Sequence, residues 1–407
     1  MQVGIIADDL TGAMDSGAQL ARAGYRTAVA FHGSPLPPAP DLDAVAVDTD
    51  SRRLEPEAAA ERVREATRKL KNAGIFYKKL DSTLRGPIVA ELEAALEESG
   101  RSRAIIAPAF PSTGRTTRGG VQLLDGEPLH ETRLAEDPVT PVREAHLPSL
   151  LADAGLEKVG ALGIGYLGVP GRFREVLEGC RWIVADATED AHLKALVETV
   201  PDPSEVLWAG SAGLVVALGE AYPGSETGMT PVESPVADSR ILTVVGSTNP
   251  AGCGQLRRLD ESSAAELVPL RSDRLLDGYG RATEEALRSC RSALGKGMGV
   301  ALYSTDDEVP EGSAGRIVEA LAEVVAVLSD EGSFDALVLT GGDTAVHVAR
   351  RLGAQGILLE GEIEPGVPVG ALIGGRSYRV ITKAGGFGAP ETLIHAQEFL
   401  AGKELKI

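Results

Sequence analysis

The chain has 407 residues, 43% of them hydrophobic, with 48 glycines, 24 prolines and a formal net charge of −19. This length fits two or three domains with sizeable cores and excludes a disordered chain, and the acidic excess disfavours nucleic acid or an anionic membrane as a partner. The sequence lacks an apolar stretch of the ~18–20 residues that span a bilayer, and its N-terminus lacks the basic and apolar regions of a secretory signal, so we expect a cytoplasmic protein.

Short apolar runs rich in β-branched residues alternate along the chain with helical patterns. This alternation predicts βαβ units, and therefore an α/β fold with mostly parallel sheets. The pattern stops between Ala221 and Ser239, where Pro, Gly, Ser and Thr are concentrated. We therefore predict an N-terminal domain over residues 1–225, a linker over 226–239, a C-terminal domain over 240–407, and a cleft between the two domains. The predicted strands include residues 3–6, 44–47, 104–107, 182–185, 241–245 and 336–340.

The first polar motif, IIADDLTGAMDSG at residues 5–17, places Asp8 and Asp9 at the end of a predicted strand. Two adjacent carboxylates repel each other unless a cation, a hydroxyl-rich ligand or a helix N-terminus offsets their charge. The motif therefore predicts a site for sugar hydroxyls or a metal. The alternative is a helix N-cap beside a solvated carboxylate.

The second motif, FYKKLDSTLRGP at residues 76–87, gathers Lys79, Asp81, Ser82 and Arg85 in an otherwise acidic chain. Cations and hydroxyls together suit a carboxylate or phosphate ligand. Strand alternation points Lys78 away from the face that Lys79 and Asp81 share. The alternative is a salt-bridged turn with Ser82 or Thr83 as a helix N-cap. Weaker candidates for ligand contacts follow other predicted strands, Arg52 in VDTDSRR and Arg115 in APAFPSTGRTTRGG.

Three glycine-containing turns follow predicted strands in the C-terminal domain, at residues 244–252, 339–348 and 381–390. Small residues at such turns let backbone N–H groups approach phosphate oxygens, and a helix that opens near Asp343 would point its positive end at them. Together these turns predict a nucleotide-binding cradle.

Several other patterns carry less weight. GIGYLG at residues 163–168 matches the dinucleotide pattern GxGxxG, but Pro170 falls where the phosphate-facing helix should begin. The Gly295–Lys296 pair lacks the remainder of a P-loop, and the six histidines show no metal-ligand spacing. The three cysteines form neither a disulfide framework nor a zinc pattern.

The motifs together resemble the four-carbon acid sugar kinase family, which includes D-threonate, D-erythronate and 3-oxo-tetronate kinases. The matching segments run in family order from residue 5 to residue 388: IADDLTGA, KKLDSTLRGP, PAFPSTGRTT, GEPLHET, DPVTPVREAHLPSLL, WAGSAGL, VVGSTNPAG, LTGGDTA and ITKAGGFG. One departure is Asp125–Gly126, where family members often have Asn-Gly. The resemblance implies a sugar-acid-binding N-terminal domain, a nucleotide-binding C-terminal domain, and ATP-dependent phosphorylation of the C4 hydroxyl of a tetronate or oxo-tetronate.

The resemblance also implies site residues. Substrate contacts would come from Asp9, Arg52, Lys79, Leu80, Asp81 and Ser82, and ATP contacts from Ser247, Gly341, Gly342, Asp343, Thr344 and Gly385. From the residues we expect Arg52, Lys79 and either Arg85 or Arg115 to bind the sugar-acid carboxylate, and Asp9 and Asp81 to hold its hydroxyls. Phosphoryl transfer also needs Mg²⁺, whose ligands stay open, and Asp343 and Asp81 compete for the role of general base.

Two functions from other classes stay as alternatives. One is a sugar-acid-binding protein without catalysis, which would need no second anion cradle. The other is an NAD-linked sugar-acid dehydrogenase, based on GIGYLG and Asp186. The particular acid and its stereochemistry stay open, and both a monomer and a homodimer fit the composition.

Overall fold

A computed structural model describes residues 1–37, 41–137, 139–167, 169–224, 239–246, 249–305 and 314–403. The chain divides into two compact units, unit 1 with Met1–Gly33 and Ala39–Met229, and unit 2 with Ser34–Pro38 and Thr230–Ile407. Almost all of the predicted linker, residues 226–239, lies outside the described residues. The predicted domain limits and the cleft between the domains stay predictions.

The described part of unit 1 is built on a parallel sheet with the strand order β2-β3-β1-β4-β11-β5-β10-β9. The strands are β1 (Val3–Ala7), β2 (Thr27–Ala30), β3 (Ala44–Asp48), β4 (Ile75–Lys79), β5 (Arg103–Ala107), β9 (Val159–Leu162), β10 (Trp182–Ala185) and β11 (Val206–Gly210). In register, Val3 of β1 lies between Ala44 and Ile75, so the carboxyl ends of β3, β1 and β4 meet at one edge. Loops after these strands therefore converge.

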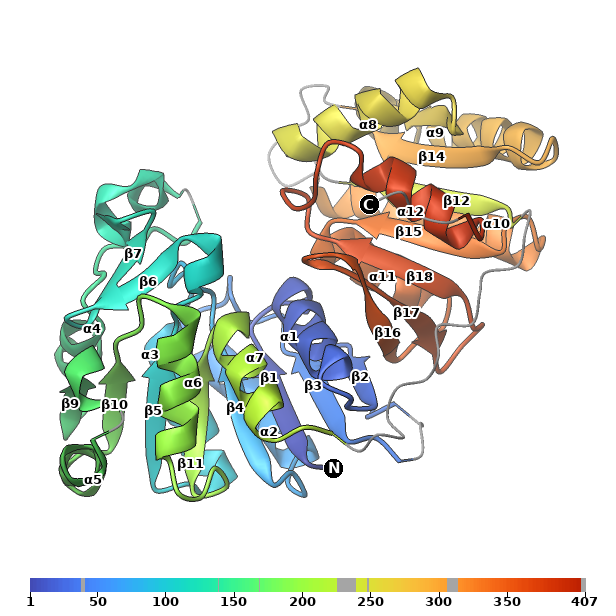
Figure 1. The fold of residues 1–407 in the computed structure, drawn as a ribbon. Helices are drawn as coiled ribbons and strands as arrows, with labels where there is room; N and C mark the ends of the chain where they lie inside the picture. Colours follow the sequence, from blue (N-terminus) through green and yellow to red (C-terminus); the bar gives the residue numbers. More distant parts are fainter. Residues whose placement is uncertain are drawn as a thin grey trace. The chain divides into compact units, whose positions relative to one another are not determined.

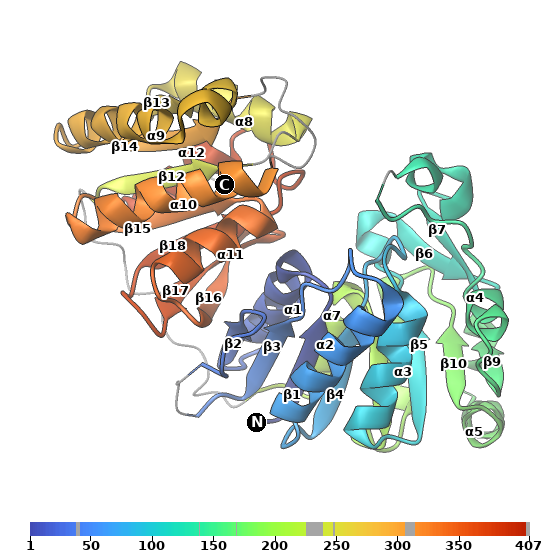
Figure 2. The same ribbon diagram turned by 180° about the vertical axis from the view of Figure 1, so that it is seen from behind.

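Helices cover both faces of this sheet. Helices α1 (Leu10–Arg22), α6 (Asp190–Thr199) and α7 (Ala212–Ala221) pack in a row, and α2 (Pro56–Lys69) packs on α3 (Ile88–Ser99). Figure 1 shows α6 and α7 in front of the sheet, and Figure 2, seen from behind, shows α2 and α3 in front. Because both faces are covered, the central strands are continuous apolar runs rather than alternating ones. Shorter helices of unit 1 are α4 (Leu147–Asp153) and α5 (Pro170–Gly179).

A small antiparallel sheet, which the sequence analysis did not predict, follows β5. It consists of β6 (Arg115–Arg118), β7 (Val121–Leu124) and β8 (Glu127–Pro128). Asp125 (φ 52°) and Gly126 (φ 90°) form the turn between β7 and β8 in the left-handed region. Asp tolerates that region, as Asn does, so the departure from Asn-Gly leaves the turn intact. Short 3₁₀ segments lie at Pro111–Thr113, Leu129–Glu131 and Arg133–Glu136.

The described part of unit 2 has the strand order β13-β14-β12-β15-β18-β17-β16. Five strands are parallel, and β17 runs antiparallel to both β18 and β16. The strands are β12 (Ile241–Val245), β13 (Ala265–Leu270), β14 (Gly299–Ser304), β15 (Ala336–Thr340), β16 (Gly356–Glu364), β17 (Val367–Ile373) and β18 (Arg379–Lys383). Helices α8 (Pro250–Ser262) and α12 (Thr392–Leu400) pack together, as do α9 (Ser272–Leu294), α10 (Ala314–Asp330) and α11 (Gly342–Arg351). Figures 1 and 2 show these two groups in front of the sheet in opposite views.

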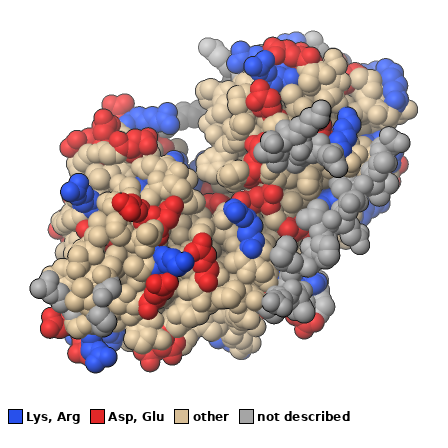
Figure 3. Space-filling view, in the orientation of Figure 1, with Lys and Arg blue, Asp and Glu red and all other residues tan. Residues whose placement is uncertain are grey.

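The predicted α/β class with mostly parallel sheets is confirmed, and each of the six predicted strands is present. In the parts of the chain that are described, no helix is both long enough and apolar enough to cross a membrane. Figure 3 shows acidic and basic side chains interspersed on one face of the molecule, without a continuous basic surface among its described residues.

Candidate functional site

The carboxyl end of β1 places two aspartates against one arginine. Asp8 is 2% exposed, and its carboxylate accepts hydrogen bonds from Nε and Nη2 of Arg52 at 2.6 and 3.0 Å. Nη1 of Arg52 lies 2.7 Å from Oδ2 of Asp9. One guanidinium therefore offsets the repulsion between adjacent carboxylates. Arg carries five N–H donors, and the described residues engage three of them, which leaves two for a ligand.

Asp9 also caps helix α1. Its Oδ1 accepts a hydrogen bond from the backbone N–H of Gly12 at 2.8 Å. A Cβ at position 12 would lie 2.8 Å from Oδ1 of Asp9 and 3.2 Å from Nζ of Lys79, so glycine allows all three groups to come together. The N-cap interpretation is thus correct for Asp9. Its second half is wrong, because Asp8 is buried and ion-paired rather than solvated.

The loop after β3 fixes the position of Arg52. The backbone N–H groups of Ser51 and Arg52 donate to the carbonyl of Asp8 at 2.9 and 3.3 Å. The hydroxyl of Thr49 donates to the carbonyl of Ala7 at 2.7 Å. These bonds continue the pairing of β3 with β1 beyond the strands and place Arg52 beside the two aspartates.

The loop after β4 supplies a second ion pair. Oδ2 of Asp81 accepts hydrogen bonds from Nε of Arg85 at 2.5 Å and from the hydroxyl of Thr83 at 2.6 Å. Lys79, the last residue of β4, is 6% exposed and donates from Nζ to the carbonyl of Leu80 at 2.8 Å. The predicted salt-bridged turn is therefore present. The predicted N-cap role of Ser82 or Thr83 is wrong, because α3 begins at Ile88 with Pro87 at its N-cap.

A buried ion pair lies next to these loops. Nζ of Lys78 lies 2.9 Å from Oε2 of Glu91, and the two side chains are 0% and 3% exposed. The hydroxyl of Ser51 donates to Oε1 of Glu91, and Nζ of Lys78 also donates to the carbonyl of Lys79 at 2.9 Å. The pair thus connects β4, α3 and the loop that carries Arg52. Strand alternation predicted that Lys78 points away from Lys79, but no sequence pattern indicated Glu91 as its partner.

The carboxylates of this edge differ in pKa. Burial disfavours the charge of Asp8, but Arg52, together with Lys78 and Lys79, outweighs burial and holds the pKa of Asp8 below its usual value. Asp81 is affected in the same way, with Arg52, Arg85 and the Thr83 hydroxyl together lowering its pKa. At Asp9 burial dominates over Arg52, and the pKa is raised. The edge therefore combines two firmly ionised carboxylates with one that takes up a proton more readily.

Gln122 on β7 connects the small antiparallel sheet to the loop after β4. Its side-chain amide donates to the carbonyl of Ser82 at 2.9 Å and accepts from the hydroxyl of Thr117 at 2.6 Å, and the residue is fully buried. Leu80, 1% exposed, is held by its N–H on the carbonyl of Gly210 at 2.8 Å. Leu80 and Ser82 are thus positioned through their backbones. No sequence pattern indicated Gln122, because its contacts depend on a hairpin that was not predicted.

Arg115 lies on a different element from the other predicted cations, in β6. Its Nη1 donates to the carbonyl of Thr113 in the preceding turn, and its Nε is buried without a hydrogen-bond partner in the described part of the chain. The structure therefore brings Arg52, Lys79 and Arg85 to the loops of β3 and β4, whereas Arg115 is held by its own turn.

The three glycine turns of unit 2 follow the adjacent strands β12, β15 and β18. A Cβ at Gly246 would lie 2.1 Å from Oγ1 of Thr344, so the turn after β12 packs directly on the first turn of α11. Gly341, with φ 98°, begins the turn to α11 and donates its N–H to the carbonyl of Lys383 at 2.9 Å. A Cβ at Gly386 would lie 3.3 Å from Nδ2 of Asn249. The three turns thus meet at the carboxyl edge of the sheet.

The remaining predicted nucleotide contacts occupy the same edge. Helix α11 begins at Gly342, as predicted, with Asp343 exposed and Thr344 2% exposed in its first turn. Gly385 follows β18 by two residues. Ser247 lies outside the described residues.

The GIGYLG segment follows β9 at the end of the unit 1 sheet. A 3₁₀ turn at Ile164–Tyr166 follows the strand, and helix α5 then begins at Pro170. The expectation that Pro170 prevents a helix there was wrong, because proline is tolerated at the first helical position.

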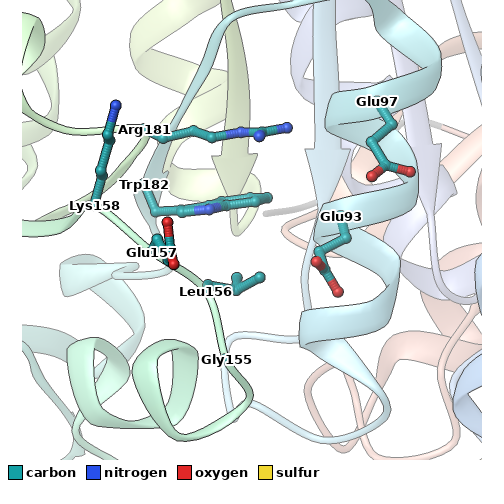
Figure 4. Close-up of a pocket in the computed structure, with 8 residues that line it drawn as sticks. All are labelled: Glu93, Glu97, Gly155, Leu156, Glu157, Lys158, Arg181 and Trp182. Atoms are coloured by element: carbon teal, nitrogen blue, oxygen red, sulfur yellow. The ribbon is translucent and has the colours of Figure 1, made fainter.

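A pocket of about 330 Å³ lies elsewhere in unit 1 (Figure 4). Its lining includes Glu93 and Glu97 of α3, Lys158 just before β9, and Arg181 and Trp182 at the start of β10. It therefore lies at the amino ends of the strands, whereas ligands of open parallel sheets bind outside the carboxyl ends. We do not assign this pocket to the site.

Two family models match the chain, a sugar-binding N-terminal domain over residues 3–218 and a nucleotide-binding C-terminal domain over residues 242–393. A D-threonate kinase from Bordetella bronchiseptica is 33% identical over 97% of this chain and 96% of its own. A D-erythronate kinase from Heliobacterium modesticaldum is 30% identical over 98% and 97%. A solved structure described as a candidate tRNA synthase from Salmonella typhimurium LT2 superposes with a TM-score of 0.84, at 24% identity over 98% of this chain and 99% of the other, which supports the fold alone.

Proposed function

The chain belongs to the four-carbon acid sugar kinase family, and from that premise we propose that it transfers the γ-phosphoryl group of ATP to the C4 hydroxyl of a threonate, an erythronate or an oxo-tetronate. The observation that carries the proposal is the presence of two polar strand edges in one chain. One edge combines carboxylates with cations, and the other presents glycine turns and a helix N-terminus.

The edge of unit 1 suits a hydroxylated acid. The two N–H donors of Arg52 that the described residues leave open, together with Lys79, would bind the carboxylate of the substrate. Arg85 lies in the loop after β4, which begins just after Lys79. Asp9, whose side chain is 29% exposed, and Asp81 would accept hydrogen bonds from substrate hydroxyls. A ligand with both a carboxylate and several hydroxyls matches this mixture of donors and acceptors.

The edge of unit 2 suits the phosphates of ATP. Gly342 and Gly385 would bring backbone N–H groups to phosphate oxygens, with the N-terminus of α11 directed at the same charge. Gly246 and Gly341, whose own N–H groups donate to the carbonyls of Thr340 and Lys383, would allow the phosphates to approach the turns closely. Thr344 would add a hydroxyl donor, and Ser247, which lies outside the described residues, stays a predicted second one. A sugar-acid-binding protein without catalysis has no use for this second edge, and an NAD-linked dehydrogenase is not supported, because the nucleotide-binding match falls on unit 2 and not on GIGYLG.

Mg²⁺ fits as an ion that arrives with ATP. Among the described residues no group of three His, Cys, Asp or Glu side chains forms a metal cage. Mg²⁺ is usually held by substrate phosphates with one or two carboxylates, and the exposed Asp343 in the first turn of α11 would be such a carboxylate. When bound, the ion neutralises charge on the β- and γ-phosphate oxygens.

In the reaction the C4 oxygen forms a bond to the γ-phosphorus, the bond to the β-phosphate oxygen of ATP breaks, and the hydroxyl proton goes to a base. Asp81 is a weak proton acceptor, because Arg52, Arg85 and Thr83 stabilise its ionised form and lower its pKa. Of the two predicted bases this leaves Asp343, which would take the proton only where the phosphates, and not its carboxylate, hold Mg²⁺. Within unit 1, the raised pKa of Asp9 makes that residue a stronger acceptor than Asp81.

Release of ADP with Mg-ATP and a panel of D- and L-threonate, D- and L-erythronate and 2- and 3-oxo-tetronate tests the proposal. We expect turnover with at least one acid. Asp343→Asn should lower kcat while Mg-ATP still binds, and Asp330→Asn, at a carboxylate that is 81% exposed at the end of α10, is the matched control. ATP binding without turnover of any acid would refute the substrate class, and absence of ATP binding would refute the kinase.

A homodimer and a cytoplasmic location stay predictions of the proposal. Light scattering coupled to size exclusion measures the first, and cell fractionation the second.

A further inference from the structure

Two buried polar side chains at the carboxyl edge of unit 2 lack the partners that burial normally requires. Lys383, the last residue of β18, is 4% exposed. Its Nζ donates only to the carbonyl of Gly385, at 3.5 Å, and no carboxylate within the described residues lies within ion-pair distance of it. Thr340, the last residue of β15, is fully buried, and its Oγ1 has no hydrogen-bond partner in the described part of the chain. A buried amine or hydroxyl left in this state is costly unless a ligand completes it.

The two side chains lie beside each other. Thr340 and Lys383 are register partners in parallel strands, so they project from the same face of the sheet at its carboxyl edge. The N–H of Gly341, the residue before α11, donates to the carbonyl of Lys383 at 2.9 Å. Lys383 therefore stands next to the helix N-terminus and the glycine turns that suit phosphates.

The nearest acidic group does not neutralise Lys383. Glu364 on β16 influences it electrostatically, but Oε1 of Glu364 is engaged by Nδ1 of His395 and Oε2 by the hydroxyl of Thr392. Burial, opposed only by Glu364, lowers the pKa of Lys383 to about 8. An anion that reaches this ammonium would gain a charge-assisted hydrogen bond and would restore the charge of the amine.

We propose that Lys383 is a phosphate-binding residue of this edge; the proposal rests on the proposed function. When a nucleotide binds, the Lys383 ammonium exchanges its long contact with the carbonyl of Gly385 for an oxygen of the nucleotide phosphates, and the Thr340 hydroxyl is a second donor. Adenosine, which lacks phosphates, would gain nothing from either group. Lys383 thus discriminates phosphorylated from unphosphorylated nucleosides.

Binding of Mg-ADP and of adenosine to the full chain, measured by calorimetry, tests the inference. Lys383→Met should weaken Mg-ADP binding at least about tenfold and leave adenosine binding unchanged, and Lys383→Arg should restore part of the loss. Thr340→Val should weaken Mg-ADP binding about threefold. Lys296→Met, at an exposed lysine of the same unit, is the matched control and should have no effect.

Proton uptake gives a second readout that a merely structural lysine would not change. At pH 8.5 a lysine with a pKa of about 8 is mostly neutral, so binding of a phosphate should draw in up to about 0.75 proton. Titrations in two buffers of different ionisation enthalpy measure this uptake. The wild type should show it and Lys383→Met should lose it.

Unchanged Mg-ADP affinity in Lys383→Met would overturn the inference. The inference would also be overturned if Lys383→Met weakened binding of adenosine as much as binding of Mg-ADP and showed the same proton uptake as the wild type. Lys383 would then only support the Gly385 turn. Neither result touches the proposed kinase if the wild type still phosphorylates a four-carbon acid. Conversely, Lys383-dependent binding of Mg-ADP in a protein that phosphorylates none of the acids would refute the proposed function and leave the phosphate contact standing.

Discussion

Removal of Glu91 should destabilise unit 1 far more than its single ion pair with Lys78 would suggest at a surface. In Glu91→Leu the fully buried Lys78 ammonium keeps, among the described residues, the carbonyl of Lys79 as a hydrogen-bond partner and the electrostatic attraction of Asp8. Breaking a buried pair in this way typically costs about 3–5 kcal/mol, because the remaining buried charge loses its paired counterion. The lost hydrogen bond from Ser51 adds about 0.5–1.5 kcal/mol. We therefore expect the free energy of unfolding of unit 1 to fall by about 3.5–6.5 kcal/mol.

The two tryptophans of the chain make this change measurable in unit 1 alone. Trp182 and Trp208 are 3% and 0% exposed, and both belong to the sheet of unit 1. Urea unfolding followed by tryptophan fluorescence therefore reports on unit 1, which avoids treating a chain of two units as one transition.

A double variant and a surface control separate the causes. Lys78→Met combined with Glu91→Leu removes both charges, and should recover most of the loss of Glu91→Leu. Glu220→Gln, whose carboxylate lies 3.7 Å from Lys194 with both side chains about half exposed, should cost less than about 1 kcal/mol. The reasoning is refuted if Glu91→Leu costs no more than this control, or if the double variant loses the sum of the two single losses.

Three further predictions concern the two edges. Gly246→Ala should weaken Mg-ADP binding at least about tenfold in calorimetry, because the added Cβ would lie 2.1 Å from Oγ1 of Thr344. The control Gly254→Ala, whose Cβ meets nothing within 4 Å, should leave Mg-ADP binding unchanged, and equal Mg-ADP affinities in the two variants would contradict the packing argument. Arg52→Lys should raise the KM for the sugar acid at least about tenfold and leave the KM for ATP unchanged, since a lysine cannot bridge Asp8 and Asp9 as the guanidinium does. The control Arg62→Lys should change neither KM value. A parallel rise of both KM values in Arg52→Lys would argue against a substrate role for Arg52. Because the pKa of Asp81 is lowered in the folded state, its contribution to stability is present above the unfolded pKa of about 3.9 and disappears as the pH falls below that value. Between pH 5 and pH 3, urea unfolding of unit 1 should therefore show a larger loss of stability in the wild type than in Asp81→Asn, and the control Asp50→Asn should behave as the wild type. Identical pH slopes in the wild type and Asp81→Asn would show that Asp81 is not the group responsible.

Elements that depend on local periodicity were predictable from the sequence. Strands β1, β3, β5, β10, β12 and β15 are short apolar runs between turn residues, and a helix does follow the glycine turn at Asp343. The motif that contains Asp9 and the motif that contains Asp81 were correctly placed at strand ends, because the change from an apolar run to polar residues marks the end of a strand in the sequence.

Features that depend on contacts between distant segments were not predictable. Nothing near Lys78 in the sequence indicates Glu91, which comes from the next helix, and nothing near Ser82 indicates Gln122, which comes from a hairpin about 40 residues later. At Pro170 a local rule was applied wrongly. Proline interrupts a helix in its interior, but Pro170 stands at the first position of α5, where a helix accepts proline.

The two edges occupy the same topological position but balance charge differently. In unit 1 the cations Arg52, Lys79 and Arg85 accompany three carboxylates, Asp8, Asp9 and Asp81, so the edge is close to neutral and offers both donors and acceptors. In unit 2 the glycine turns carry no charge, and Lys383 is a buried cation without a paired acid among the described residues. A chain with a net charge of −19 repels anionic substrates over its surface as a whole, so attraction for them has to come from such local arrangements. A nearly neutral edge suits an acid with a single negative charge, which Arg52 and Lys79 would bind while the carboxylates accept its hydroxyls, whereas a polyphosphate needs unpaired positive charge. The buried Lys383, without an acid partner among the described residues, therefore favours the edge of unit 2 as the one that would take the polyphosphate.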